Sequence, residues 1–73
     1  MKKYYKIEIA YNTREMIDRV DDFRMWLYDN NIKHETSSAG DFVHFEILLA
    51  SNEVEKVNNA LDTIVWFDSI VNK

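Results

Sequence analysis

The feature that most constrains the fold is the alternating pattern of residues 41–50, DFVHFEILLA. Every second residue of this stretch is large and apolar: Val43, Phe45, Ile47 and Leu49. That period of two is typical of a strand with one buried face. The residues between them mix aromatic, titratable and apolar types: Phe42, His44, Glu46 and Leu48. A mixed second face is typical of a strand in the middle of a sheet, so we expect the sheet to be built around this stretch.

Chain length predicts a single domain with a thin core. The 73 residues, 47% of them hydrophobic, are enough for one globular α+β domain over residues 1–73. A domain of this size buries only about 60% of the surface of its unfolded chain, so self-association would add stability. The chain has no cysteine, which excludes disulfides and thiolate chemistry and suits a reducing compartment.

The first half of the chain predicts a strand followed by a helix. Residues 3–10 alternate between apolar or aromatic and polar types, as in a half-buried strand. Asn12 and Glu15 have the spacing of a capping box, so a helix is expected to begin there. Helical spacing places four apolar residues on one stripe that would cover a sheet: Met16, Val20, Phe23 and Leu27. The helix should end near Asp29 or Asn30, where the pair Asn30-Asn31 tolerates left-handed backbone.

The second half predicts a hairpin, a helix and a last strand. Residues 32–36 form the expected second strand, and the run 37–40, SSAG, forms the turn into the central strand. Ser51 is the predicted cap of a second helix. Residues 65–70, which are β-branched and aromatic, predict a fourth strand, with continued helix as the alternative.

This order of elements, β-α-β-β-α-β, is the ferredoxin-like arrangement. It has an antiparallel sheet with the first and third strands at its centre and both helices on one face. The other sheet face is left open. If the chain stays helical after residue 64, the fold is instead β-α-β-β-α with a long C-terminal helix.

The hairpin register decides whether the two histidines meet. A three-residue loop would pair His34 with His44 and push charged residues into the core. A four-residue loop over residues 37–40 pairs Ile32 with Phe45 and keeps Ile32 inside, so burial favours it. His34 is then partly buried and hydrogen-bonded, and His44 lies alone on the outer face. We expect no metal site, since the tight His/Cys/Asp cluster of zinc sites is also missing.

The outward side of the first helix is one candidate binding surface. It carries the carboxylates of four aspartates, with Met25 and Trp26 predicted to be exposed beside them: Asp18, Asp21, Asp22 and Asp29. Tryptophan is enriched at interface hot spots, and carboxylates steer a basic partner. We therefore expect a protein partner with a basic surface. Mimicry of DNA phosphates by these carboxylates is an alternative.

The open sheet face is a second candidate, with Tyr4, Phe42, His44 and Leu48 as its contact residues. It would pair with a copy of itself or with another protein. In outline the arrangement resembles an RNA recognition motif, in which aromatic residues on the two central strands stack on bases. The resemblance makes binding of single-stranded RNA an alternative function. However, DFVHF at residues 41–45 replaces the motif's basic-Gly-aromatic run, and three nearby glutamates would repel phosphate.

Catalysis is not expected. The serines serve turns and caps, neither histidine has a nucleophile beside it, and the single glycine excludes a phosphate-binding loop, so we predict no catalytic residue and no cofactor. A net charge of −4 disfavours nucleic acid as a partner. The N-terminus is too charged for a signal peptide and no stretch is apolar enough for a membrane span, which predicts a cytoplasmic protein.

Together these features predict a small acidic protein-binding module that acts as an inhibitor or an adaptor. The abundance of Lys, Asn, Ile and Tyr is compatible with an AT-rich gene, such as that of a bacteriophage or a low-GC bacterium. A phage-encoded inhibitor of a host enzyme is one form that this function could take.

Overall fold

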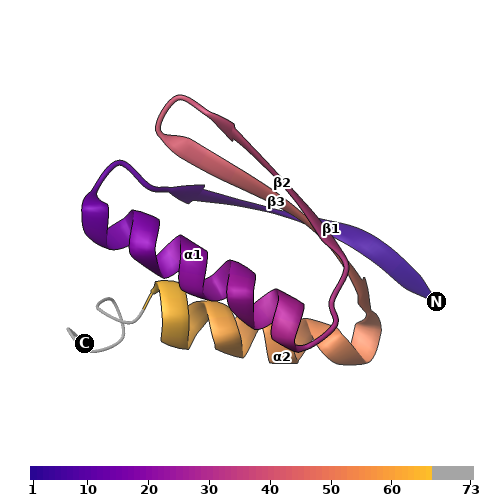
Figure 1. Ribbon diagram of the computed structural model, residues 1–73. Helices are drawn as coiled ribbons and strands as arrows, with labels where there is room; N and C mark the ends of the chain where they lie inside the picture. Colours follow the sequence, from indigo (N-terminus) through magenta and orange to yellow (C-terminus); the bar gives the residue numbers. More distant parts are fainter. Residues whose placement is uncertain (67–73) are drawn as a thin grey trace.

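The alternating stretch at residues 41–50 forms the middle strand of the sheet. The computed structural model describes residues 1–66, in which β1 (Lys2–Ala10), β2 (His34–Ala39) and β3 (Phe42–Ala50) form one antiparallel sheet of order β1-β3-β2. α1 (Arg14–Asp29) connects β1 to β2. After β3 come a 3₁₀ turn, η1 (Ser51–Glu53), α2 (Val54–Ala60) and a π-helical turn, η2 (Leu61–Val65). Figure 1 shows α1 and α2 side by side on one face of the sheet, and no helix of residues 1–66 covers the other face.

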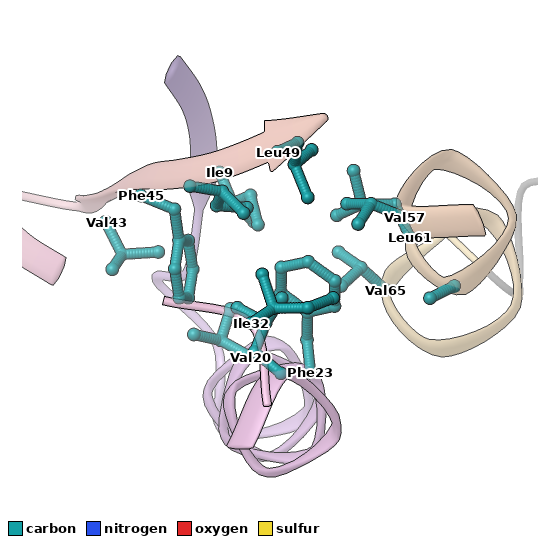
Figure 2. Packing of buried hydrophobic residues seen from close by; sticks show 13 residues of the cluster. Ile9, Val20, Phe23, Ile32, Val43, Phe45, Leu49, Val57, Leu61 and Val65 are labelled. Atoms are coloured by element: carbon teal, nitrogen blue, oxygen red, sulfur yellow. The ribbon is translucent and has the colours of Figure 1, made fainter. Parts of the chain in front are cut away.

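The predicted inner row of β3 is the wall of the core. Val43, Phe45, Ile47 and Leu49 are all buried, as the period of two requires. Val20, Phe23 and Leu27 of α1 pack against them, and Phe23 meets Phe45 edge to face with ring centroids 5.4 Å apart. Figure 2 shows Val57, Leu61 and Val65 closing the core from the side of α2 and η2. The predicted apolar stripe of α1 is therefore confirmed.

The predicted fourth strand is not confirmed. Val65, its expected first residue, ends η2 and is buried among helical residues, and residues 67–70 lie outside the described part of the chain. In residues 1–66 the sheet has three strands, so β1 lies at its edge rather than at its centre. The structure is thus an α+β fold with a three-stranded antiparallel sheet, and its helical path continues beyond α2 as the alternative prediction proposed.

Thr13, not Asn12, caps α1. The Thr13 hydroxyl oxygen accepts a hydrogen bond from the backbone N–H of Met16 at 3.2 Å. Glu15 does not complete a capping box, because its carboxylate pairs instead with Arg19 one turn later, at 2.7 Å. Threonine and asparagine are both good caps, so the spacing to Glu15 alone selected the wrong one.

The end of α1 agrees with the prediction. Asn31 adopts φ 56°, a left-handed conformation that asparagine tolerates better than most residues. The backbone N–H of Ile32 then bonds the carbonyl of Leu27 at 2.9 Å, which turns the chain back and buries the Ile32 side chain. Ile32 is therefore buried in the connection and not as part of β2.

The predicted hairpin register is wrong. β2 continues through Ala39, and a two-residue turn, Gly40-Asp41, joins it to β3, so His34 lies opposite Ile47 instead of Val43. Gly40 has φ +61°, as expected at the first position of a type II′ turn. Both registers place the same face of β2 toward the core, because they differ by an even number of residues. Burial therefore could not choose between them.

Ser51 does not cap the second helix. It lies inside η1, where the Glu53 carboxylate accepts a hydrogen bond from the backbone N–H of Ala50 at 2.9 Å. The helical path ends in η2, where the Trp66 N–H bonds the Leu61 carbonyl, five residues earlier, at 2.9 Å.

None of the helices in residues 1–66 is both long enough and apolar enough to cross a membrane.

Candidate protein-binding surfaces

α1 presents an acidic surface on the side away from the core. Asp18, Asp22, Met25 and Asp29 are all exposed and lie at positions i, i+4, i+7 and i+11, which share one helix face. We call these four residues the acidic stripe. Met25 is 62% exposed, between the carboxylates. The predicted exposure of these four residues is confirmed.

Two of the three arginines of α1 are paired with other carboxylates, while Arg14, one turn before Asp18, forms no ion pair in the described residues. Arg19 bonds Glu15 and also donates to the carbonyl of Val65 at 3.3 Å. Arg24 pairs with Asp21. Within residues 1–66 no ion pair reaches the three aspartates of the acidic stripe, so their negative charge is left for solvent or for a partner.

Trp26 is not an exposed anchor, contrary to the prediction. Its ring stacks parallel to that of Phe23, with centroids 6.2 Å apart, and packs against the core. The Lys56 ammonium of α2 lies 5.9 Å from the ring centroid, on the side where the two helices meet. Trp26 sits about 90° around the helix from the buried stripe, a flank that a second helix can cover. Trp26 is therefore covered between the core and Lys56 of α2.

Tyr28 is an exposed aromatic residue that the helical pattern did not single out. It is 65% exposed and lies one position before Asp29. Its ring contacts His34 edge to face, with centroids 4.7 Å apart. That contact holds the Tyr28 ring at one side of the acidic stripe. In the sequence, only the position of Tyr28 between the buried face and the acidic face of the helix indicated that it would be exposed.

The open sheet face carries the other predicted residues. Tyr4 and Phe42 are 46% and 43% exposed, and Leu48, opposite Tyr4, is half-buried. His44 lies opposite Glu8, and its Nδ1 is 3.5 Å from the Glu8 carboxylate. The structure does not gather these residues into one patch, because Tyr4 and Leu48 lie toward one end of the sheet and Phe42 toward the other.

Polar residues occupy the middle of this face. The middle of the face has a shallow hollow of about 390 Å³. Polar residues of all three strands line most of it: Lys6, Glu8, Ser37, His44 and Glu46. Glu46 lies opposite Lys6 on one side and Glu35 on the other, yet in the described residues Lys6 forms no ion pair with it. The centre of the open face is therefore charged, and its two ends are apolar.

The two histidines lie on opposite faces of the sheet. The His34 ring is partly buried, and its Nδ1 lies 2.9 Å from the carbonyl of Ile32, so it donates there. Its Nε2 is buried and has no hydrogen-bond partner in the described residues. His44 is on the open face. No group of three or more His, Asp and Glu side chains in residues 1–66 is placed to hold a metal ion.

These features define a class: a small α+β protein with two helices on one face of a three-stranded antiparallel sheet, and with charged surfaces rather than a deep pocket. No protein-family model, no curated protein and no solved structure matches the chain.

Proposed function

We propose that the protein is a binding module that holds a basic surface of another protein against the acidic stripe of α1, and that it acts as an inhibitor or an adaptor. The observation that carries this proposal is the position of Met25, 62% exposed among three aspartates that have no described ion-pair partner. An exposed methionine surrounded by carboxylates combines an adaptable apolar contact with an acidic rim.

The two parts of the surface would have different effects on binding. The aspartates would attract a basic partner over a distance of about 8 Å at physiological salt, which raises the association rate. Met25, and Tyr28 beside it, would exclude water once the partner has docked, which slows dissociation. Binding should therefore weaken as salt concentration rises, mainly through a slower association.

The alternatives have less support from the geometry. For RNA, bases would have to stack on Tyr4 and Phe42, which lie at opposite ends of a face that carries Glu8, Glu35 and Glu46.

For DNA mimicry, the axial separations along the acidic stripe are uneven. Asp18 and Asp22 are separated by about 6 Å, and Asp22 and Asp29 by about 10 Å, at 1.5 Å per residue. Regularly spaced phosphates are not reproduced by this pattern.

A cytoplasmic setting is part of the proposal, since a chain without cysteine suits a reducing compartment. A phage-encoded inhibitor of a host enzyme is its narrowest form. The partner is defined by its chemistry alone: a folded protein with clustered Lys and Arg around an apolar contact point.

The test is capture from a nuclease-treated lysate by three immobilised proteins: the wild type, a stripe variant and a matched control. The stripe variant carries Asp18→Asn, Asp22→Asn and Asp29→Asn. The control carries Asp41→Asn, Glu55→Gln and Asp62→Asn, three exposed positions elsewhere. Each variant loses three negative charges, so the net charge of both changes from −4 to −1. Circular dichroism establishes that both variants are folded.

We expect the wild type and the control to capture the same protein and the stripe variant to lose it. Reversal of charge at the partner's basic surface should then abolish capture by the wild type as well. If all three proteins capture the same set, or if only a nuclease-sensitive RNA is recovered when the nuclease is omitted, the proposal is wrong.

A further inference from the structure

The uncovered sheet face has a charge pattern that is complementary to itself. We propose that two copies of the chain pack these faces together, with the two-fold axis in the plane of the interface and perpendicular to the strands. This surface is separate from the acidic stripe, because the stripe points away from the sheet, so the inference does not depend on the proposed partner.

The complementarity on β1 comes from Lys6 and Glu8. Both are exposed, and as residues two apart on a strand they share the open face. An axis that crosses the sheet at Ile7 reverses the strand direction of the second copy and leaves β1 facing β1. Lys6 of each copy then faces Glu8 of the other, which forms two ion pairs.

The same operation gives favourable pairs on β3. The axis crosses this strand at Phe45, which lies opposite Ile7. Glu46 of each copy then faces His44 of the other, and Leu48 faces Phe42. The apolar ends of the two faces therefore meet, and the central hollow of each face is filled by polar side chains of the other copy.

On β2 the operation brings Glu35 of each copy to Ser37 of the other. The axis crosses β2 at Thr36, opposite Phe45. A hydroxyl can donate a hydrogen bond to a carboxylate, so no strand places two like charges against each other.

The other two-fold axis that opposes these faces is unfavourable. An axis that runs parallel to the strands along β3 keeps β3 on β3 but does not reverse the rows. Lys6 would then face Glu35, but Glu46 would face Glu46 and His44 would face His44. Like charges directly opposite are destabilising, so the pairs along β3 favour the perpendicular axis.

Sheet twist does not remove the match. Stacked sheets keep their strand directions within about 30° of each other. The charged rows are next to the axis, where such a rotation moves β1 of one copy by only about 2–3 Å relative to the other, given a strand separation of about 4.8 Å. A lysine side chain spans that displacement easily.

The size of the face predicts a weak dimer. The strands β1 and β3, of nine residues each, are about 30 Å long, and β2, of six residues, is about 20 Å long. At a spacing of about 4.8 Å the three strands give a flat footprint of roughly 380 Å² before side-chain relief is counted. Stable interfaces bury about 800 Å² on each partner. We therefore expect a reversible dimer with a dissociation constant in the micromolar range, below about 100 μM.

The test is sedimentation equilibrium of the full chain over a concentration series, with charge-reversal variants. K6E places glutamate against Glu8 of the second copy, and E8K places lysine against Lys6, so each variant alone should be monomeric where the wild type is dimeric. A mixture of the two variants should form a heterodimer, because both pairs across the axis again have opposite charges. Circular dichroism of each variant alone checks that it is folded.

The geometry makes the mixture the decisive measurement. A fold defect in either variant cannot produce an association that appears only on mixing. A wild type that stays monomeric at about 1 mM, well above the expected dissociation constant, would overturn the proposal. So would a dimeric wild type whose two variants remain monomeric when they are mixed, because β1 would then not face β1.

Discussion

Gly40 is the residue whose backbone most directly determines the hairpin. Its φ of +61° lies in the left-handed region, and a Cβ placed there would meet no atom within 4 Å, so the cost of substitution is conformational and not a clash. Gly40→Ala should lower the free energy of unfolding by about 1 kcal/mol. Gly40→Asn should cost about as much, since the first position of a type II′ turn, with ψ of about −120°, lies outside the αL region that asparagine tolerates. Urea unfolding of both variants measures the loss, and a variant as stable as the wild type would contradict the assigned conformation.

The cap of α1 is a feature for which the sequence allowed two predictions. Thr13 and Asn12 are adjacent and both are good caps, and nothing in their order distinguishes them. The structure decides, because the Thr13 hydroxyl reaches the Met16 N–H while Glu15 is held by Arg19. The left-handed Asn31 was predictable, because few residues other than glycine accept that conformation and the helix had to end there.

At the scale of elements, Arg19 connects α1 to η2. Its side chain is 17% exposed, bonds Glu15 and donates to the Val65 carbonyl of the π-helical turn. Arg19→Met keeps the apolar stem but removes these bonds, and should cost about 1–2 kcal/mol of unfolding free energy, since hydrogen bonds to charged groups exceed neutral ones. Glu15→Gln is the matched control and should cost less than about 0.5 kcal/mol, because that carboxylate is largely exposed.

Thermal or urea unfolding of the two variants gives the comparison. If Glu15→Gln cost as much as Arg19→Met, the contact with Val65 would contribute nothing, and η2 would be held to α1 by its apolar side chains alone.

The strands and helices were predictable where one period dominates. The inner row of β3 and the buried stripe of α1 follow from periods of two and 3.6 with large apolar residues at every required position. The hairpin register was not predictable, because a shift by an even number of residues keeps His34 and Thr36 on the same face. The turn itself depends on one left-handed residue, Gly40, and not on the whole run of small residues before it.

At the scale of the whole molecule, the candidate surfaces could be predicted only in part. Helical spacing placed the acidic stripe correctly, since exposure depends on the angle from the buried face. The prediction of exposure failed for Trp26. Whether the flank of α1 is covered depends on the position of α2, which is set by tertiary packing and not by helical spacing. Pairing of the open sheet face with a second copy was among the predictions, but its charge pairing was not, because Lys6, Glu8, His44 and Glu46 come together only through the register of β1 with β3.

The central claim is that the acidic stripe of α1 contacts a basic protein, and methionine methyl resonances test it directly. The chain has three methionines: Met25 within the stripe, Met16 partly buried at the core, and Met1 at the terminus. Titration of ¹³C-methyl-labelled protein with the captured partner should shift or broaden the Met25 signal at a concentration where those of Met16 and Met1 are unchanged. A complex that forms while the Met25 signal stays in place would contradict the account.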